Sequence, residues 1–345
     1  MKESLMRPSA GESTPEIKPL PSPNPSAVES AGAPPAASAS ADIMNGAAIS
    51  SGLATNKDRL YDPAPKYVKV IEPPSGWPTP NLAELWQYRD LLFMLIWRDI
   101  SATYRQSIIG YGWAVFKAVT QTAAGTLVFS VIAGLDGKPG IPYPLLIFVG
   151  IMPWMYFSIS LNGANNSLAG SAHLLTKVYF PRLILPLSSL GTGLVDFGIQ
   201  FVLLVAALPF FIGVPGWTML LAPVFVAACM LTAFSLGLWF TALNVKYRDI
   251  GHLVPFLIQI GMWVTPVYYL SENLGSHMGK WSWLLGLNPM TGVIEGFRWA
   301  MLSSAGTIEP PDWSMMAVSF TVVALLFVSG LYFFRRVEGT FVDVI

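Results

Sequence analysis

The stretch Arg98–Trp113 reads RDISATYRQSIIGYGW and joins an amphipathic segment to a long apolar one. Apolar and aromatic residues recur at helical spacing around it, which places them on one stripe of a helix, with Arg98 and Arg105 on the opposite side. The stripe consists of Phe93, Ile96, Trp97, Ile100, Tyr104 and Ile108. This pattern alone fits either a helix in a membrane interface or a surface helix of a soluble domain. The next segment favours the membrane, because residues 113–133 hold one charge, Lys117, near an edge where its stem can return the ammonium to water.

The composition excludes several classes of protein. Hydrophobic residues make up 53% of the 345 positions and charged residues 12%, against about 25% charged residues in soluble domains. Twenty basic and twenty acidic residues give no net charge, which argues against nucleic-acid binding. The one cysteine, Cys229, rules out an internal disulfide and a cysteine-based zinc site.

Residues 1–80 are predicted to form a disordered cytoplasmic tail and linker rich in proline, alanine and serine, and residues 81–345 the membrane domain. The tail has no aromatic residue before Tyr61 and cannot bury enough apolar surface to offset its ordering entropy. Two roles stay open for it: a solvated tail without an essential role, and a segment that docks a partner or regulates. An amphipathic interface helix over about residues 82–107 follows, with Asn81 as its N-cap.

Six segments are long and apolar enough to cross a hydrocarbon core, which takes about 20 helical residues. They are Gly112–Gly134, Tyr143–Ala169, Leu185–Ile212, Trp217–Val245, His252–Leu270 and Trp313–Phe334. We therefore predict an all-α integral membrane protein with six transmembrane helices. Prolines inside these segments predict kinks or unwound turns. These prolines are Pro153, Pro186, Pro223, Pro255 and Pro266.

A seventh apolar segment, Trp281–Leu302, contains Glu295 and Arg298 and is broken by Asn288 and Pro289, an N-cap and a first-turn proline. Lysine and arginine in short loops indicate its topology. With a cytoplasmic N-terminus, six spans place eight of them inside and three outside, whereas seven spans place six inside and four outside. We therefore expect both termini in the cytoplasm and two re-entrant outer half-helices between spans five and six.

The sequence contains no recognisable catalytic motif. The histidines His173, His252 and His277 are scattered, and none has metal-ligand spacing with a carboxylate. Residues 134–139 read GLDGKP and lack the phosphate-binding pattern G-x-x-x-x-G-K-[ST]. We therefore expect no enzyme activity, no metal site and no nucleotide site in this chain.

Asp196 is the only acidic residue inside a predicted span, and a charge at that depth needs compensation. It is either a group facing a conduit or, the interpretation we favour, a structural anchor bonded to Gln200 or to an asparagine cluster. The cluster is Asn162, Asn165 and Asn166.

Two short loops between spans, His173–Arg182 and Lys246–Ile250, are charged and compact. Topological anchoring alone would explain their charges. Phe180 and Pro181 place an aromatic ring and a rigid turn in the first loop, and this favours a docked partner there.

Five ordered motifs resemble the type-2 ABC permeases, and within them the branch that exports lipid-linked polysaccharide such as O-antigen, capsule and teichoic acid. The resemblance covers residues 82–345. The motifs are YRQS at Tyr104–Ser107 followed by Gly110 and Trp113, FPRLILPL at Phe180–Leu187, YRDI at Tyr247–Ile250, TPVYY at Thr265–Tyr269, and NPMTGVIEGFRWAML at Asn288–Leu302.

The resemblance implies a homodimer in the bacterial inner membrane, bound to two cytoplasmic ATPase subunits that hold ATP and magnesium, and a polyprenyl-pyrophosphate-linked glycan as substrate. The interface helix and the two charged loops would contact the ATPases. The coupling residues would be Arg98, Arg105, His173, Lys177, Phe180, Pro181, Arg182, Tyr247, Arg248 and Asp249.

The resemblance further implies that the first and fifth spans line a conduit and that the half-helices form an outer gate. The aromatic rings could instead face lipid or lie in an interfacial belt. The conduit candidates are Trp113, Phe116, Lys117, Trp263, Tyr268 and Tyr269, and the gate candidates are Asn288, Pro289, Met290, Glu295 and Arg298.

This chain departs from the family pattern at Ala118, where members often carry a proline, and Lys117 precedes it. We expect a straighter first span, and we hypothesise that Lys117 attracts the pyrophosphate of the substrate. Other functions stay open: the same fold exporting a teichoic-acid precursor, a drug or a lipid, a membrane glycosyltransferase or acyltransferase, or a membrane scaffold without transport.

Overall fold

A computed structural model describes residues 82–339 except 106, 176, 214–215, 273–278 and 307. Within these residues every regular element is a helix and no strand occurs. The described helices belong to one compact unit, Pro74–Ile345. The predicted tail over residues 1–80, its N-cap Asn81, and His277 lie outside the described residues.

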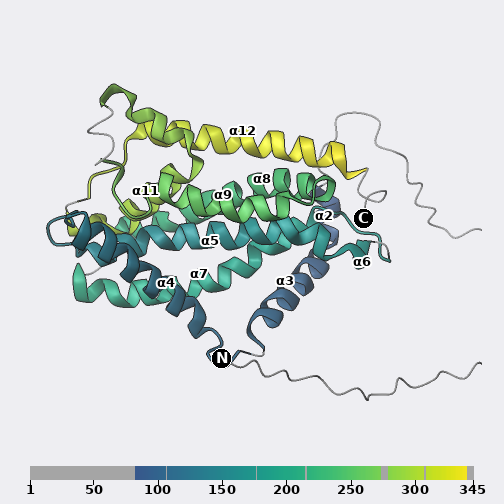
Figure 1. Cartoon of the computed structure of the whole chain (residues 1–345), viewed down its shortest axis with the longest axis horizontal. Coiled ribbons are helices and arrows are strands. Elements are labelled where there is room, and N and C mark those ends of the chain that lie inside the picture. Colours follow the sequence, from purple (N-terminus) through teal and green to yellow (C-terminus); the bar gives the residue numbers. More distant parts are fainter. Residues whose placement is uncertain are drawn as a thin grey trace, which may run out of the picture. The chain divides into compact units, whose positions relative to one another are not determined.

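The helices follow the chain in a simple order. They are α2 (Leu82–Gln87), α3 (Arg89–Tyr104), α4 (Gly112–Thr126) with its π-helical end η1 (Leu127–Ile132), α5 (Tyr143–Gly170), α6 (Ala172–Leu175), α7 (Ile184–Phe211), η2 (Trp217–Leu221), α8 (Ala222–Lys246), α9 (Ile250–Val264), η3 (Gly279–Leu287), α11 (Pro289–Leu302), η4 (Ser303–Ala305) and α12 (Trp313–Glu338). Figure 1 shows the long helices α5, α7, α8 and α12 running side by side.

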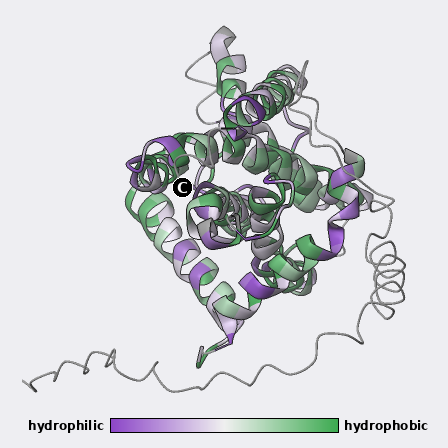
Figure 2. Cartoon of the chain, turned by 90° about the vertical axis from the view of Figure 1, so that its right-hand side faces the viewer, coloured by the Kyte–Doolittle hydropathy of each residue, from purple (hydrophilic) through white to green (hydrophobic). Residues whose placement is uncertain are grey.

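Five helices of the described part are long and apolar enough to cross a membrane. They confirm five predicted spans: Gly112–Ile132, Tyr143–Gly170, Ile184–Phe211, Trp217–Lys246 and Trp313–Glu338. Hydrophobic residues are prominent on the outer helices as well as in the centre when the bundle is viewed end on (Figure 2). This distribution is typical of a protein whose outer surface faces lipid.

The predicted fifth span, His252–Leu270, is wrong in its extent. The helix α9 has only 15 residues and ends at Val264. Pro266 explains the end, because a proline disfavours helical geometry in the residue before it, and Thr265 is extended with φ −82° and ψ 142°. A sixth crossing, and the re-entrant character of the segment after it, stay predictions.

Two of the five predicted kinks are also wrong. Pro186 and Pro223 lie in the first turns of α7 and α8, where a missing N–H costs no helical hydrogen bond. Pro153 and Pro255 do lie inside α5 and α9.

The helix α5 is the centre of the bundle. It packs against α4, α7, α8, α9 and α11. In its most apolar stretch 83% of the residues are buried, against 17–33% in the other four long helices. The other spans therefore pack against α5 and its neighbours through one face, and the rest of their surface is not covered by the chain.

Small residues let the helices around α5 approach closely. A Cβ on Gly163 of α5 would lie 2.8 Å from Ser189 of α7, and one on Gly237 of α8 would lie 2.8 Å from Ala164 of α5. Hydrogen bonds follow the same contact, since Thr241 Oγ1 donates to the Ala164 carbonyl at 2.6 Å. Such small-residue contacts let membrane helices pack without a hydrophobic driving force between them.

The predicted interface helix is two helices, α2 and α3, broken at Tyr88. The helix α3 packs along α7. The predicted apolar stripe is only partly the face of α3 that makes this contact. Ile96 meets Gly191 of α7 and Leu95 is 4% exposed, whereas Phe93 and Trp97 are 66% and 71% exposed. The helix therefore carries a second apolar face that the chain itself leaves open.

We predict that Gly296→Ala destabilises the fold. A Cβ at Gly296 of α11 would overlap the ring of Phe225 in α8, and overpacking of this kind costs about 1–3 kcal/mol. Thermal unfolding in detergent measures the effect. Gly198→Ala in α7 is the matched control, because nothing lies within 4 Å of its Cβ position. Equal melting temperatures for the two variants would contradict the packing described here.

Candidate functional site

One end of the bundle, here called the α6 end, gathers most of the predicted coupling residues. A separate hydrophobic cluster joins α3, the end of α5, the start of α7 and the last turns of α8 and α12 there. It consists of Leu95, Leu168, Phe180, Leu183, Ile184, Leu185, Leu238, Ala242 and Phe334. Figure 1 places α2, α6 and the end of α12 together at this end. The cluster makes these chain segments one packed body.

The loop before α7 is held by this cluster. Phe180 is 6% exposed and Pro181 is buried, so the structure places both inside the chain and not on its surface. Arg182 donates from Nη1 to the backbone carbonyl of Glu338, which ties the loop to the end of α12. Among the described side chains of the loop, His173, Lys177, Val178 and Tyr179 are exposed.

The turn between α8 and α9 presents the other predicted coupling residues to the outside. Tyr247 is 51% exposed, and Arg248 and Asp249 are exposed beside it. Arg98 and Arg105 of the interface segment are also exposed, and Arg98 pairs with Asp99 at 2.8 Å. The structure thus leaves a charged surface on both the turn and the interface segment.

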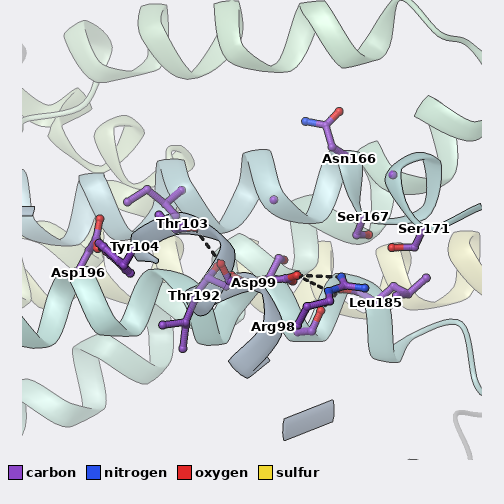
Figure 3. Close-up of a pocket in the computed structure, with 16 residues that line it drawn as sticks. Arg98, Asp99, Thr103, Tyr104, Asn166, Ser167, Ser171, Leu185, Thr192 and Asp196 are labelled. Carbon is purple, nitrogen blue, oxygen red and sulfur yellow. Dashed lines mark hydrogen bonds and ion pairs between the residues drawn. The ribbon is translucent and has the colours of Figure 1, made fainter. Parts of the chain in front are cut away.

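A polar cavity of about 350 Å³ lies between α3, α5 and α7. Figure 3 shows side chains from the three helices around it. Its polar lining is Arg98, Asp99, Thr103, Tyr104, Asn166, Ser167, Ser171, Ser188, Ser189, Thr192 and Asp196. Hydroxyl, amide and carboxylate groups therefore line the region where α3 packs against the membrane-spanning helix α7.

Tyr104 donates a hydrogen bond to Asp196 at the end of this cavity opposite to Ser171 and Leu185 (Figure 3). Asp196 is 7% exposed, so the bond supplies the compensation that a carboxylate inside a span needs. The predicted partners are wrong: Gln200 donates to the Ala114 carbonyl at 3.4 Å, and no bond joins the asparagine cluster to Asp196 among the described residues. Sequence reasoning missed Tyr104 as a partner because 92 positions separate the two residues.

The helices α4 and α9 each pack against the rest of the bundle through only one narrow face. Small residues of α4, among them Ala114 and Ala118, are buried against the bundle, and α4 is continuous through Ala118. Trp113, Phe116 and Lys117 are exposed on α4, and Trp263 is 54% exposed on α9. Gln121 of α4 donates to the Met262 sulfur of α9 at 3.5 Å, so the two helices are neighbours.

Two of the predicted conduit residues, Tyr268 and Tyr269, are more covered by the chain than Trp263. Tyr268 is 6% exposed and stacks on Phe129 with a centroid distance of 5.3 Å. Tyr269 is half-buried, and its hydroxyl donates to the Val264 carbonyl at 3.0 Å. Both rings therefore pack within the chain beside Trp263, while Trp263 itself stays open.

Arg298 joins two of the motifs at the opposite end of the bundle, here called the α11 end. Its side chain is fully buried in α11 and donates to the carbonyls of Pro266 and Val267 at 3.1 and 3.0 Å. Glu295 receives a bond from Arg298 at 2.9 Å and another from the Ser271 N–H at 3.0 Å. The guanidinium thus satisfies two backbone carbonyls of the non-helical segment that follows α9.

Asn288 holds the start of α11, as predicted for an N-cap. Its Oδ1 accepts from the Met290 N–H at 3.1 Å, and its Nδ2 donates to Thr265 Oγ1 at 2.7 Å. Pro289 occupies the first turn and Met290 is buried. Both ends of the Thr265–Ser271 segment are therefore fixed to α11.

Long apolar helices, with charged turns at one end of the bundle and a segment held by buried charges at the other, define a multi-pass membrane protein. Residues 90–302 match the ABC-2 type transporter family, and the chain belongs to that family. Membership makes it a transport subunit and implies an ATPase partner. The predicted family is confirmed.

Three relatives are similar over most of their length. One is the O-antigen export system permease protein RfbA of Myxococcus xanthus, 31% identical over 256 residues, which span 74% of this chain and 96% of that protein. Two proteins of the same description from Klebsiella pneumoniae are 24% and 23% identical over 262 residues, covering 74% of this chain and 95% of each relative.

We predict that Tyr104→Phe destabilises the contact between α3 and α7. It removes the donor to a buried carboxylate, which costs about 1–3 kcal/mol. Thermal unfolding of the purified protein measures the loss. Tyr111→Phe is the control, because the Tyr111 ring packs against Tyr104 at a centroid distance of 4.4 Å and its hydroxyl makes no hydrogen bond with a described residue. A Tyr104→Phe protein as stable as the control would show that Asp196 does not depend on Tyr104.

Proposed function

We propose that this chain is the membrane permease of an ATP-driven exporter of O-antigen polysaccharide, acting as a homodimer with two ATPase subunits in a bacterial inner membrane. The observation that carries the proposal is the 31% identity to an O-antigen export permease over 96% of that protein's length. The substrate would be a lipid-linked glycan, and both termini would be cytoplasmic. This orientation puts the α6 end in the cytoplasm.

The α6 end supports a coupling role. Exposed charges on the interface segment and on the α8–α9 turn offer a docking surface, while Phe180 and Pro181 hold the loop in place from inside. We therefore assign contact to the exposed residues and positioning to the buried ones. ATP and magnesium would bind to the partner subunits, whose closure would displace the packed body at this end.

The Tyr104–Asp196 bond gives this displacement a route into the membrane. It connects α3, which reaches the α6 end, to α7 within its span. A movement of α3 would therefore pull on α7 directly. Both bonded groups belong to the polar cavity, which leaves room for such a movement.

The open faces of α4 and α9 support a conduit role. A lipid-facing surface is apolar, whereas here Lys117, Thr120 and Gln259 are exposed among aromatic residues. Charged and polar side chains in spans normally face protein or a water-filled pathway. In a homodimer these faces would line the path of the glycan, with Trp113, Phe116 and Trp263 available for stacking on sugar rings.

Purification of the tagged chain in detergent, followed by mass spectrometry of co-eluting proteins and lipids, tests the proposed function. We expect a stoichiometric ATPase and a polyprenyl-linked glycan. Recovery of the ATPase with a drug or simple lipid as cargo would reject the glycan, and recovery of the chain without an ATPase would reject the whole proposal.

We predict that Lys117→Gln lowers export about fivefold without affecting assembly. An exposed contact between an ammonium and a phosphate contributes about 1 kcal/mol, which corresponds to that factor. Export of labelled glycan into vesicles measures the rate. Lys117→Arg keeps the charge and should retain export. Equal export rates for the Lys117→Gln and wild-type proteins would show that Lys117 does not contribute to transport.

We predict that Arg182→Ala uncouples ATP hydrolysis from transport. Loss of the bond to the Glu338 carbonyl frees the loop from α12, so closure of the ATPases would no longer move the packed body as a unit. The ratio of glycan exported to ATP hydrolysed should fall severalfold. Arg182→Lys retains a donor and should fall less, and a normal ratio in Arg182→Ala would contradict the coupling role of this loop.

A further inference from the structure

A groove, separate from the polar cavity, lies on the outside of the bundle at the α6 end, between the last turns of α8 and α12. Its volume is about 760 Å³, within the range of about 300–1,000 Å³ that suits small-molecule ligands. Two facing helical stripes line it, spaced at three and four residues along each helix. On α8 the stripe is Trp239, Ala242, Leu243 and Lys246, and on α12 it is Ser329, Tyr332, Phe333, Arg336 and Val337.

The groove changes from apolar to basic along its length. Trp239 and Phe333 stack at 4.3 Å with an interplanar angle of 13°, and Leu243 and Val337 continue the apolar wall. Lys246 follows Leu243, and Arg336 follows Phe333, by about one helical turn; both cations are exposed, and Val337 lies next to Arg336. None of the described residues that line the groove is acidic. The gradient from rings to cations matches a molecule with an apolar tail and a negative head.

The two cations are not neutralised within the described part of the chain. No ion pair joins Lys246 or Arg336 to a described carboxylate, and Lys246 lies 5.2 Å from the ring centroid of Tyr247. The neighbouring Arg335 differs, since it pairs with Glu338 at 3.0 Å. Lys246 and Arg336 therefore offer positive charge to a ligand.

The position of the cations identifies the source of the ligand. Lys246 ends the candidate span Trp217–Lys246, and Arg336 lies in the last turn of Trp313–Glu338. The cations thus lie at the level of lipid headgroups while the rings lie at the level of the acyl chains. Basic pockets between transmembrane helices at this level recognise anionic lipid headgroups.

We propose that the groove between α8 and α12 is a binding site for an anionic phospholipid, with the headgroup phosphate at Lys246 and Arg336 and an acyl chain along Trp239, Leu243 and Phe333. The site lies apart from the α4–α9 face and is independent of the exported cargo. A bound lipid would cover the otherwise open side of the α8–α12 contact beside the coupling turn.

Native mass spectrometry of the full-length chain, titrated with phosphatidylglycerol or phosphatidylcholine, tests the proposal. The wild-type protein should bind phosphatidylglycerol in preference to phosphatidylcholine. Lys246→Gln/Arg336→Gln should weaken phosphatidylglycerol binding about fivefold for each charge removed, from about 1 kcal/mol per cation, and should abolish the preference. Arg89→Gln removes an exposed charge elsewhere and should bind as the wild type does.

A steric variant tests the apolar part of the groove. Leu243→Trp keeps every charge and fills the groove, so it should lower the binding of both lipids. Unchanged phosphatidylglycerol binding in both the charge and the steric variants would overturn the proposal. So would binding that appears only after deletion of residues 340–345, because the chain's own end would then be the occupant.

Discussion

The close approach of α5 to α7 and α8 is the contact on which the other helices depend. Lipid is as apolar as a leucine side chain, so burial from water does not hold membrane helices together. Gly163 and Gly237 bring the backbones together, and Thr241 adds a hydrogen bond to an α5 carbonyl. The interface segment attaches to this centre through α7, and α12 attaches through α8.

Buried charges then fix the peripheral elements to this centre. Asp196 is compensated by Tyr104 on α3, and Arg298 serves Glu295 and the carbonyls after α9. Asp196 and Tyr104 come from different helices, and Arg298 of α11 binds the segment that follows α9. A polar group that is costly to leave unpaired in lipid therefore specifies which elements meet.

Local features of the fold could be predicted from the sequence, because length, hydropathy and capping are properties of a segment. Five spans begin within one residue of their predicted starts, and Asn288 caps α11. The partner of Asp196 and the burial of Phe180 could not be predicted, since both depend on contacts between distant segments. The face of α3 was ambiguous because apolar residues occupy two sides of it.

The short helix α9 has a consequence for the surrounding bilayer. Its 15 residues span about 22 Å, against a hydrocarbon core of about 30 Å. In the proposed orientation, the remaining thickness would fall to the segment Thr265–Ser271, which Arg298 and Glu295 hold against α11. Hydrophobic mismatch of this kind costs a fraction of a kcal/mol per Å. The acyl-chain length of the host membrane therefore becomes a determinant of how stable the α11 end is.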